Sequence, residues 1–402
     1  MIRRLLVSAV LMLAALAGGI WLGGHPDRLP GPVQDALVQK DIAIIGDGLG
    51  VLQRRYYRAP NQTQVAETAL KAAVESLDDQ YSSYLTPKDL VRFNEVTSSR
   101  FEGIGVAVEK GKSGLVVAQV YDGSPAKASG IRAGDVITKA AGKSLAGLST
   151  NAASALIRGK QGTSVVLEIE RDGKAMEKRV KRDEVRIPAV ETDYDAKAKV
   201  GTVRLASFSE GAHGEVSAAI TALEKRGAKG VVLDLRSNPG GLVEEAKLLS
   251  SLFLKGGKIV TTKGRAVRER TLEAGDSPKF PTLPLVVLVD HNSASASEIV
   301  TGALQDRGRA KVYGTRTYGK GVFQEIIPLS SGGAMDITVG QYYTPKGRNL
   351  GGAGVARGQD VSRGKGIAPD VTAEDDPSTP KVDEARDDAV DAVAKLIAKQ
   401  GR

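Results

Sequence analysis

The chain has 402 residues, 41% of them apolar and 26% charged, which is the composition of a globular protein with two or three folded units. Its net charge of +9 comes from lysines and arginines interleaved with acids, and only 4% of the residues are aromatic, so nothing favours nucleic-acid binding. The chain contains no cysteine, which excludes disulfides, thiol nucleophiles and thiolate metal sites.

An apolar run from Leu5 to Leu22 follows Arg3 and Arg4 and predicts an export segment over residues 1–27. Ala15-Leu16-Ala17 resembles a cleavage site, but the run, at about 18 residues, is also long enough to span a bilayer. We therefore expect an exported protein, periplasmic or otherwise extracytoplasmic. Whether residues 5–22 are removed or anchor the protein to the inner membrane stays open.

Residues 28–96 are predicted to form a mainly helical arm, because apolar residues recur at three- and four-residue spacing from Val65 to Leu77. The stretch from Tyr81 to Pro87 breaks this pattern. Such an arm serves packing or dimerisation, so the sequence leaves a homo-oligomer open.

The rest of the chain predicts two domains and a last helix. Residues 97–184 carry short strand-like runs with glycine-bearing turns, typical of a small β-rich module. Residues 185–375 alternate apolar strands with helical stretches, which indicates an α/β core. An acidic linker then leads to an amphipathic helix within residues 376–402. The predicted fold class is a multidomain α/β protein with helical N- and C-terminal arms.

A peptide-binding site is predicted where Gly103-Ile104-Gly105-Val106 runs from a glycine turn into a strand. Backbone amides in such a turn can point at a carboxylate, and the edge of the strand can take up a peptide as an extra strand. On these four residues alone a plain hairpin turn is the better interpretation. The run from Gly123 to Ile137, however, closely resembles the turn, helix and strand of a PDZ domain.

Histidine and metal chemistry are poorly supported. A Ser-His-Asp triad needs a histidine base, but His25 lies in the leader and His213 in a polar loop. His291, four residues before Ser295, remains as an alternative base. The three scattered histidines offer no short-spaced pair of ligands, so no metal site is predicted.

Two further motifs fail on their context. Residues Gly314 to Lys320 match the first seven positions of a P-loop, but Gly321 stands where a Ser or Thr would hold magnesium. The segment from Ser124 to Lys127 has Ser-x-x-Lys spacing but falls within the PDZ-like turn. We interpret it as structural.

The strongest catalytic signal is a serine cluster that follows an apolar strand. Leu285 to Val289 leads into Ser293-Ala294-Ser295-Ala296-Ser297-Glu298, after which apolar residues lie on one helical face. A nucleophile at this turn would lie near the positive end of a helix, although a serine-rich helix cap gives the same pattern. Downstream, Lys320 is flanked by glycines and apolar residues. Burial would lower its pKa and make a neutral amine available as general base.

These segments together resemble the carboxyl-terminal processing proteases, also called tail-specific proteases, from about residue 65 to residue 373. The matching motifs are Ser293 to Glu298, Gly319 to Gln324, Leu233 to Gly241 and Tyr81 to Pro87. In that family the nucleophile is the middle serine of the cluster and the base lysine lies 25 positions later, which selects Ser295 and Lys320. Gln324 matches the glutamine that orients the lysine.

The resemblance implies further roles. The backbone amides of Ala296 and Gly241 would form the oxyanion hole, with Gly240 the less favoured donor. Arg158 lies in a stretch that links tail binding to the protease core, so it is the candidate relay, with an ordinary surface arginine as the alternative. The core would be crotonase-like and ClpP-like, and neither a metal nor an organic cofactor is implied. One departure is Asp290-His291-Asn292, where the family commonly shows Asn-Gly-Gly.

The sequence thus predicts a serine endopeptidase with a Ser-Lys dyad that cleaves exported proteins near or from their C-termini, with PDZ recognition and gating by the tail. Its partners would be proteins or peptides with accessible C-termini. Two rivals stay open: a non-catalytic PDZ scaffold of the cell envelope and a P-loop nucleotidase. One geometric demand follows, because fully extended residues Lys320 to Gln324 would hold their Cα atoms about 13 Å apart. Glycines at 319 and 321 would have to permit a bend.

Overall fold

The structure is a computed structural model that describes residues 40–351, 366–379 and 382–400, with four isolated positions of the leader (12, 15, 18 and 19); for residues 40–43 it describes the backbone alone. The predicted export segment otherwise lies outside the described residues. Among the residues described, no helix combines the length and apolarity needed to cross a membrane. The chain divides into two compact units, Met1–Leu77 and Asp78–Arg402.

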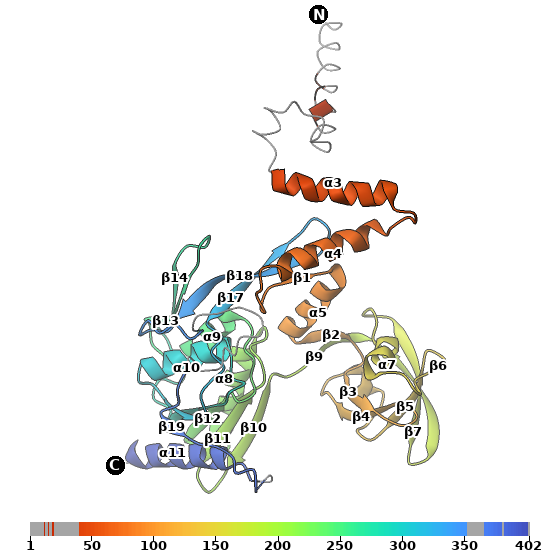
Figure 1. The fold of residues 1–402 in the computed structure, drawn as a ribbon. Coiled ribbons are helices and arrows are strands. Elements are labelled where there is room, and N and C mark those ends of the chain that lie inside the picture. Colours follow the sequence, from red (N-terminus) through yellow and green to blue (C-terminus); the bar gives the residue numbers. More distant parts are fainter. Residues whose placement is uncertain are drawn as a thin grey trace, which may run out of the picture. The chain divides into compact units, whose positions relative to one another are not determined.

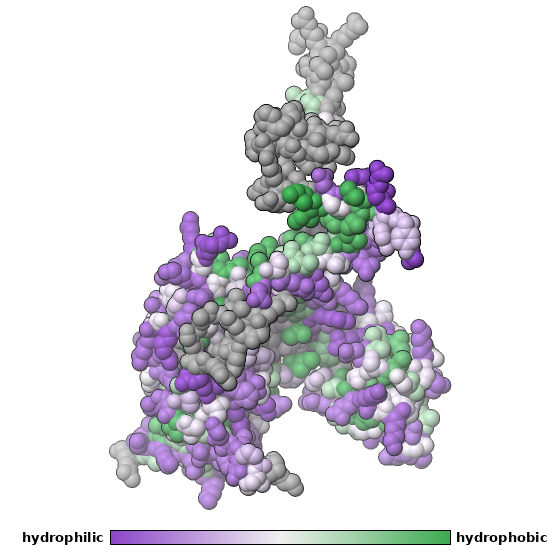
Figure 2. All heavy atoms as spheres, in the orientation of Figure 1, coloured by the Kyte–Doolittle hydropathy of each residue, from purple (hydrophilic) through white to green (hydrophobic). Residues whose placement is uncertain are grey.

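The first unit contains helices α3 (Lys40–Arg55) and α4 (Gln62–Glu75). Helix α4 begins at Asn61, whose side chain accepts a hydrogen bond from the Gln64 amide at 3.1 Å, as expected of an N-cap. Apolar side chains gather on the surface of α3, coloured green in Figure 2, and they include Ile44, 68% exposed.

The second unit begins with strand β1 (Ser83–Leu85) and helix α5 (Pro87–Ser98). Strand β1 lies in the stretch that interrupts the predicted helical arm, and it pairs antiparallel with β18 (Ala334–Tyr343), with Ser83 opposite Asp336. Its partner is so distant in the sequence that local periodicity could not reveal the pairing. Strand β1 thereby ties the segment that precedes the β-rich module to the core.

The β-rich module is entered and left through a two-stranded ribbon, β2 (Arg100–Gly103) with β9 (Asp183–Arg186). Its antiparallel sheet has the order β3-β4-β5-β7-β8, and β6 pairs with β5. Its strands and helices are β3 (Val106–Lys110), β4 (Leu115–Val120), α6 (Pro125–Ala128), β5 (Val136–Ala140), β6 (Lys143–Ser144), α7 (Thr150–Ile157), β7 (Ser164–Arg171) and β8 (Lys174–Lys181). Alternate apolar residues of these strands pack with residues of α6 and α7 into one core, to which Ile137 and Leu167 belong.

The α/β core is built on a sheet of order β10-β11-β12-β15-β16-β19, in which only β10 is antiparallel to its neighbour (Figure 1). The strands are β10 (Val190–Asp195), β11 (Val200–Leu205), β12 (Gly230–Asp234), β15 (Leu285–Val289), β16 (Lys311–Gly314) and β19 (Val371–Thr372). Strands β12 and β15 are buried along their whole length, as expected for parallel strands covered on both faces.

Helices cover both faces of this sheet. Val231 and Leu233 pack in the cluster with α8 (Ala212–Lys225), α9 (Val243–Ser251) and α10 (Ala296–Asp306), whereas Val232, between them, packs with α11 (Glu384–Gln400). A second sheet has the order β1-β18-β13-β14, with β17 (Val322–Pro328) also on β18; β13 is Lys258–Lys263 and β14 is Arg270–Glu273. The predicted fold class, an α/β core with a β-rich module, is confirmed.

Candidate active site

Three loops meet where neighbouring parallel strands end. They follow β12, β15 and β16, whose carboxyl ends lie at the same edge of the sheet, the usual location of ligands in such sheets. The loop after β15 carries the serine cluster. The loop after β12 carries Gly240 and Gly241, and the loop after β16 carries Lys320.

Ser295 occupies the N-cap position of α10 with φ 56° and ψ −113°. A positive φ is unfavourable for a residue with a Cβ, and such conformations concentrate at functional sites. The other two serines of the cluster are buried and bonded to backbone: Ser293 Oγ donates to the Leu235 carbonyl at 2.8 Å, and Ser297 Oγ donates to the Asn238 carbonyl at 2.9 Å. The Ser295 side chain is half-exposed at the start of the helix. The geometry therefore favours Ser295 as the nucleophile.

The glycine loop lies directly against Ser295. A Cβ added to Gly240 would come within 2.7 Å of Ser295 Cβ and 2.9 Å of the Ala296 nitrogen, so only glycine fits there. The Gly240 amide donates to Asn238 Oδ1 at 2.9 Å. Within the described chain, the amides of Gly241 and Ala296 donate to no other residue. These two amides are the donors that the sequence predicts for the oxyanion hole, and the assignment stays a prediction.

Glu298 joins the serine turn to the lysine loop. It is fully buried, and its Oε2 accepts hydrogen bonds from the amides of Ser295 and Lys320, each at 2.9 Å. Its Oε1 accepts from Thr317 Oγ1 at 2.6 Å and from the Gly319 amide at 2.8 Å. Burial raises the pKa of Glu298, while these four donors act in the opposite direction. One carboxylate thus fixes the backbone of both proposed catalytic residues.

The same contacts bear on the P-loop interpretation. In a P-loop the backbone amides bind phosphates. Here the amides of Gly319 and Lys320, and the hydroxyl of Thr317, are occupied by Glu298. The donors that a nucleotide phosphate would need are therefore already bonded to a carboxylate.

Burial lowers the pKa of Lys320, while the carboxylates of Asp336, Asp79 and Glu298 act in the opposite direction. The ammonium nitrogen lies over the ring of Tyr81, 4.8 Å from its centre. No hydrogen bond from Lys320 Nζ to Ser295 Oγ occurs in the described part of the chain. The Tyr342 hydroxyl donates to the Lys320 carbonyl, and burial raises the pKa of this phenol.

Gln324 lies on β17, where the pairing with β18 shifts register between Phe323 and Gln324. Its Nε2 donates to Thr338 Oγ1 at 3.0 Å, and the described residues show no contact between its side chain and that of Lys320. The backbone bends before the strand, with φ +91° at Gly319. The structure thus places Gln324 on the neighbouring strand without joining it to the lysine, and its orienting role stays a prediction.

The predicted peptide-binding turn lies at the mouth of a cavity of about 210 Å³. Ile104 and Gly105 connect β2 to β3, and their amides donate to no residue in the part of the chain that is described. Gly105 has φ +82°, and a Cβ there would come within 2.2 Å of Ser124 Cβ. Arg158 lines the same cavity, pairs with Glu95 of α5 at 3.0 Å and lies over the Phe101 ring at 5.1 Å.

His213 and His291, the two histidines that follow the predicted leader, have different surroundings. His213 Nδ1, on α8, lies 2.8 Å from Glu245 Oε2, on α9. His291 is exposed and lines a polar cavity of about 810 Å³ together with Arg236 and Arg316. Groups of acidic or histidine side chains that could hold a metal do not occur among the described residues.

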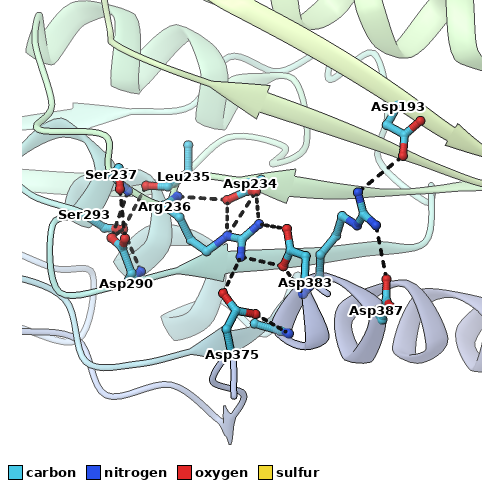
Figure 3. A network of polar contacts seen from close by, with 12 residues as sticks. Asp193, Asp234, Leu235, Arg236, Ser237, Asp290, Ser293, Asp375, Asp383 and Asp387 are labelled. Carbon is cyan, nitrogen blue, oxygen red and sulfur yellow. Dashed lines mark hydrogen bonds and ion pairs between the residues drawn. The ribbon is translucent and has the colours of Figure 1, made fainter. Parts of the chain in front are cut away.

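Figure 3 shows a polar network beside the glycine loop. The guanidinium of Arg236 bonds Asp234 and Asp383, with Asp375 at 3.7 Å. Asp290 accepts hydrogen bonds from the amide and the hydroxyl of Ser237. The network ties the loop after β12 both to α11 and to the turn that carries the serines.

Comparison with known proteins decides the family. Residues 199–372 match Peptidase family S41, and residues 103–181 match the PDZ domain. The chain belongs to peptidase family S41. The family predicted from the sequence motifs, with its PDZ domain, is confirmed.

This S41 peptidase is 35% identical over 333 residues to a probable CtpA-like serine protease of Staphylococcus aureus strain MRSA252, and 37% identical over 334 residues to one of strain N315. Each alignment covers 82% of this chain and 64% of the relative, so the chain spans just under two thirds of the length of these curated relatives. A solved structure named photosystem II D1 C-terminal processing protease is 28% identical, with 86% of this chain and 89% of that chain covered and a TM-score of 0.47.

Sequence reasoning assigned no role to several residues that surround the site of this S41 peptidase. Glu298 and Tyr81 were recognised only as members of motifs, whereas Asp336, Thr338 and Tyr342 were not singled out. An acid three residues after the proposed nucleophile, at the start of a predicted helix, was the available signal for Glu298. For the others the deciding fact is strand pairing across the whole chain, which a single sequence does not display.

Proposed function

We propose that this S41 peptidase is a serine endopeptidase that cleaves exported proteins near or from their C-termini, with Ser295 as nucleophile and Lys320 as general base. The observation that carries the proposal is the convergence at Ser295. A half-exposed serine in a strained conformation lies beside two unpaired amides, and its backbone shares a buried carboxylate with a lysine whose pKa is lowered.

The chemistry follows from these groups. Ser295 Oγ attacks the carbonyl carbon of the scissile bond while neutral Lys320 takes the hydroxyl proton. The amides of Ala296 and Gly241 donate to the oxyanion, and the ammonium returns its proton to the leaving amine. Water then attacks the acyl-enzyme, with the lysine again as base. Neither a metal nor an organic cofactor takes part in this scheme.

In the described residues Lys320 Nζ lies over the Tyr81 ring, and Gln324 is bonded to Thr338. The lysine amine has to approach Ser295 Oγ before it can accept the proton, and in this proposal it does so while it stays beside the ring. Tail binding would favour this approach.

The PDZ domain supplies substrate recognition in this proposal. The unpaired amides at Ile104 and Gly105 can bind a terminal carboxylate, and strand β3 offers an edge for the peptide. The class of partner is therefore a protein or peptide with an accessible C-terminus. The apolar run over residues 5–22 supports an extracytoplasmic location for the encounter.

In this proposal Arg158 relays the binding of a substrate tail in the PDZ domain to the active site. Its guanidinium lines the tail cavity and pairs with Glu95, and both side chains are partly exposed, at 52% and 30%. A pair of this kind is worth about 0–1 kcal/mol, so a bound tail can displace it at little cost. An activation coupling of about 1–3 kcal/mol would raise the active population some 5- to 150-fold.

The test is cleavage of an unstructured protein, with and without its last residues, followed by mass spectrometry. The wild type should cut the intact substrate, and Ser295→Ala should bind it without cutting. Binding without turnover by the wild type would instead establish the rival function, a non-catalytic PDZ scaffold.

A further inference from the structure

We propose that Tyr81 is a positioning residue for the catalytic lysine, and that the turn from Asp79 to Tyr84 forms a wall of the active site. The proposal rests on the proposed function, in which Lys320 is the base. Its starting point is the position of the Lys320 ammonium over the Tyr81 ring, 4.8 Å from the ring centre.

The turn is held in place on both sides of Tyr81. Asp79, which is 5% exposed, accepts hydrogen bonds from the Tyr81 amide at 2.8 Å and from Ser82 Oγ at 2.6 Å. Ser82 Oγ accepts in turn from the Thr338 amide on β18 at 3.0 Å. Strand β1 then continues along β18 from Ser83 onwards. The ring is thus fixed relative to the strand that carries Asp336 and Tyr342.

The charged and titratable groups around Lys320 come from each neighbouring element. They are Asp79 from the turn, Asp336 from β18 and Glu298 from α10, with the phenols of Tyr81 and Tyr342. No described carboxylate forms an ion pair with the lysine. The pKa of Tyr81 is raised by burial and by the neighbouring Tyr318, so its side chain stays a neutral ring and cannot itself serve as base.

A ring suits the task of this lysine better than an acid would. During acylation Lys320 becomes an ammonium in a site from which water is largely excluded. The π face attracts that charge by about 0.5–2 kcal/mol, yet offers no oxygen that could retain the proton. A contacting carboxylate would interact far more strongly and would hold the lysine in its charged form. Tyr81 can therefore stabilise and hold the transient ammonium while leaving the amine able to release its proton.

The experiment compares the pH dependence of kcat in the full chain with Tyr81→Leu and Tyr81→Phe. The ring favours the ammonium, so its removal lowers the lysine pKa. In Tyr81→Leu the acid limb of the kcat–pH profile should shift to lower pH by about one unit. The maximal kcat should fall about tenfold or more, with KM nearly unchanged. Tyr81→Phe keeps the ring and should keep the limb within about 0.3 pH unit.

A matched control is Tyr194→Leu on strand β10. The Tyr194 ring also lies beneath a cation, with the guanidinium of Arg226 5.1 Å from its centre. This substitution should leave the limb in place. If Tyr81→Leu does not fold, replacement of Tyr81 by trifluorophenylalanine weakens the π face without changing its shape and should lower the limb relative to Tyr81→Phe. An unchanged limb in both ring-altered variants, or an equal loss of kcat in Tyr81→Phe, would overturn the proposal.

The lysine titration can also be followed without turnover, by ¹⁵N NMR of labelled lysine side chains, with Lys320→Arg to assign the signal. A wild type that cleaves nothing would defeat the proposed function. The same NMR comparison of Tyr81→Leu with the wild type would still decide whether the ring sets the lysine pKa.

Discussion

Replacing Glu298 by glutamine should reveal how strongly the site depends on one buried carboxylate. Glu298 accepts four hydrogen bonds, two at each oxygen. A glutamine side chain has one accepting oxygen and one donating NH₂ group. Whichever way the amide turns, two of the four donors face a donor in place of an acceptor.

The cost can be estimated from the geometry. Placing the NH₂ group towards Thr317 is the cheaper choice, because that hydroxyl can rotate whereas the backbone amide of Gly319 cannot. A buried donor left unpaired costs about 1–3 kcal/mol, and the two surviving bonds lose their charge assistance, about 1 kcal/mol each. The substitution should therefore lower the free energy of unfolding by about 3–5 kcal/mol. For a core of this size the corresponding fall in Tm is roughly 6–20 °C.

Activity should fall as well, because the donors include the amides of Ser295 and Lys320. A misplacement of about 1 Å between reacting groups can cost about 100-fold, so we expect kcat to fall some 10- to 100-fold. The matched control is Glu244→Gln on α9, a side chain that is 55% exposed and paired with Lys247. It should change stability by no more than about 0.5 kcal/mol. Thermal unfolding and peptide cleavage measure both effects, and a Glu298→Gln protein with the Tm and kcat of the wild type would refute the reasoning.

Other substitutions test other parts of the site. Ser295→Ala should abolish cleavage while circular dichroism and tail binding stay unchanged; residual turnover would point to another nucleophile. Lys320→Arg should be as inactive as Lys320→Ala, because a guanidinium keeps its proton, and wild-type cleavage should rise with pH through a lysine pKa that burial holds below 10.5. Amidation of the substrate's C-terminus should slow cleavage, and Arg158→Ala should lower turnover more than tail affinity. Gating would be dismissed if the acid and amide substrates were cleaved at equal rates, and if an enzyme lacking residues 97–184 cleaved them at that rate too. Arg236→Ala leaves two buried or half-buried acids without their partner and should cost about 3–5 kcal/mol in denaturant unfolding.

Much of the fold could be read from the sequence because its signals are local. Strands β12 and β15 are continuous apolar runs, and the helix after the serine cluster shows its apolar face in its own spacing. The middle serine was selected by the family resemblance, through the 25-residue spacing to Lys320 that the family shows. The structure adds an independent reason to prefer Ser295, since the hydroxyls of Ser293 and Ser297 donate hydrogen bonds to backbone carbonyls.

The parts that could not be read depend on distant pairing and on side-chain orientation. The stretch after Leu77 looked like a break between helices, but it is a strand whose partner, β18, lies near the other end of the core. Likewise, the glycines around Lys320 allow the backbone to turn, with φ +91° at Gly319, but they could not show that Gln324 would bond Thr338 and not the lysine. Spacing constrains backbone paths, whereas rotamers are decided by neighbours that only the folded chain brings together.

This difference between backbone and side chains also bears on how tail binding could activate the protease. Glu298 fixes the backbone at Ser295, Gly319 and Lys320, so the main chain of the site needs no rebuilding. What separates the described arrangement from a competent dyad is the orientation of two side chains, Lys320 and Gln324. Rotamer changes of this kind involve only weak contacts, among them the hydrogen bond from Gln324 to Thr338, worth about 0.5–1.5 kcal/mol. A coupling of about 1–3 kcal/mol from a bound tail would suffice for such a change, so tail binding could complete the site without any large movement of the core.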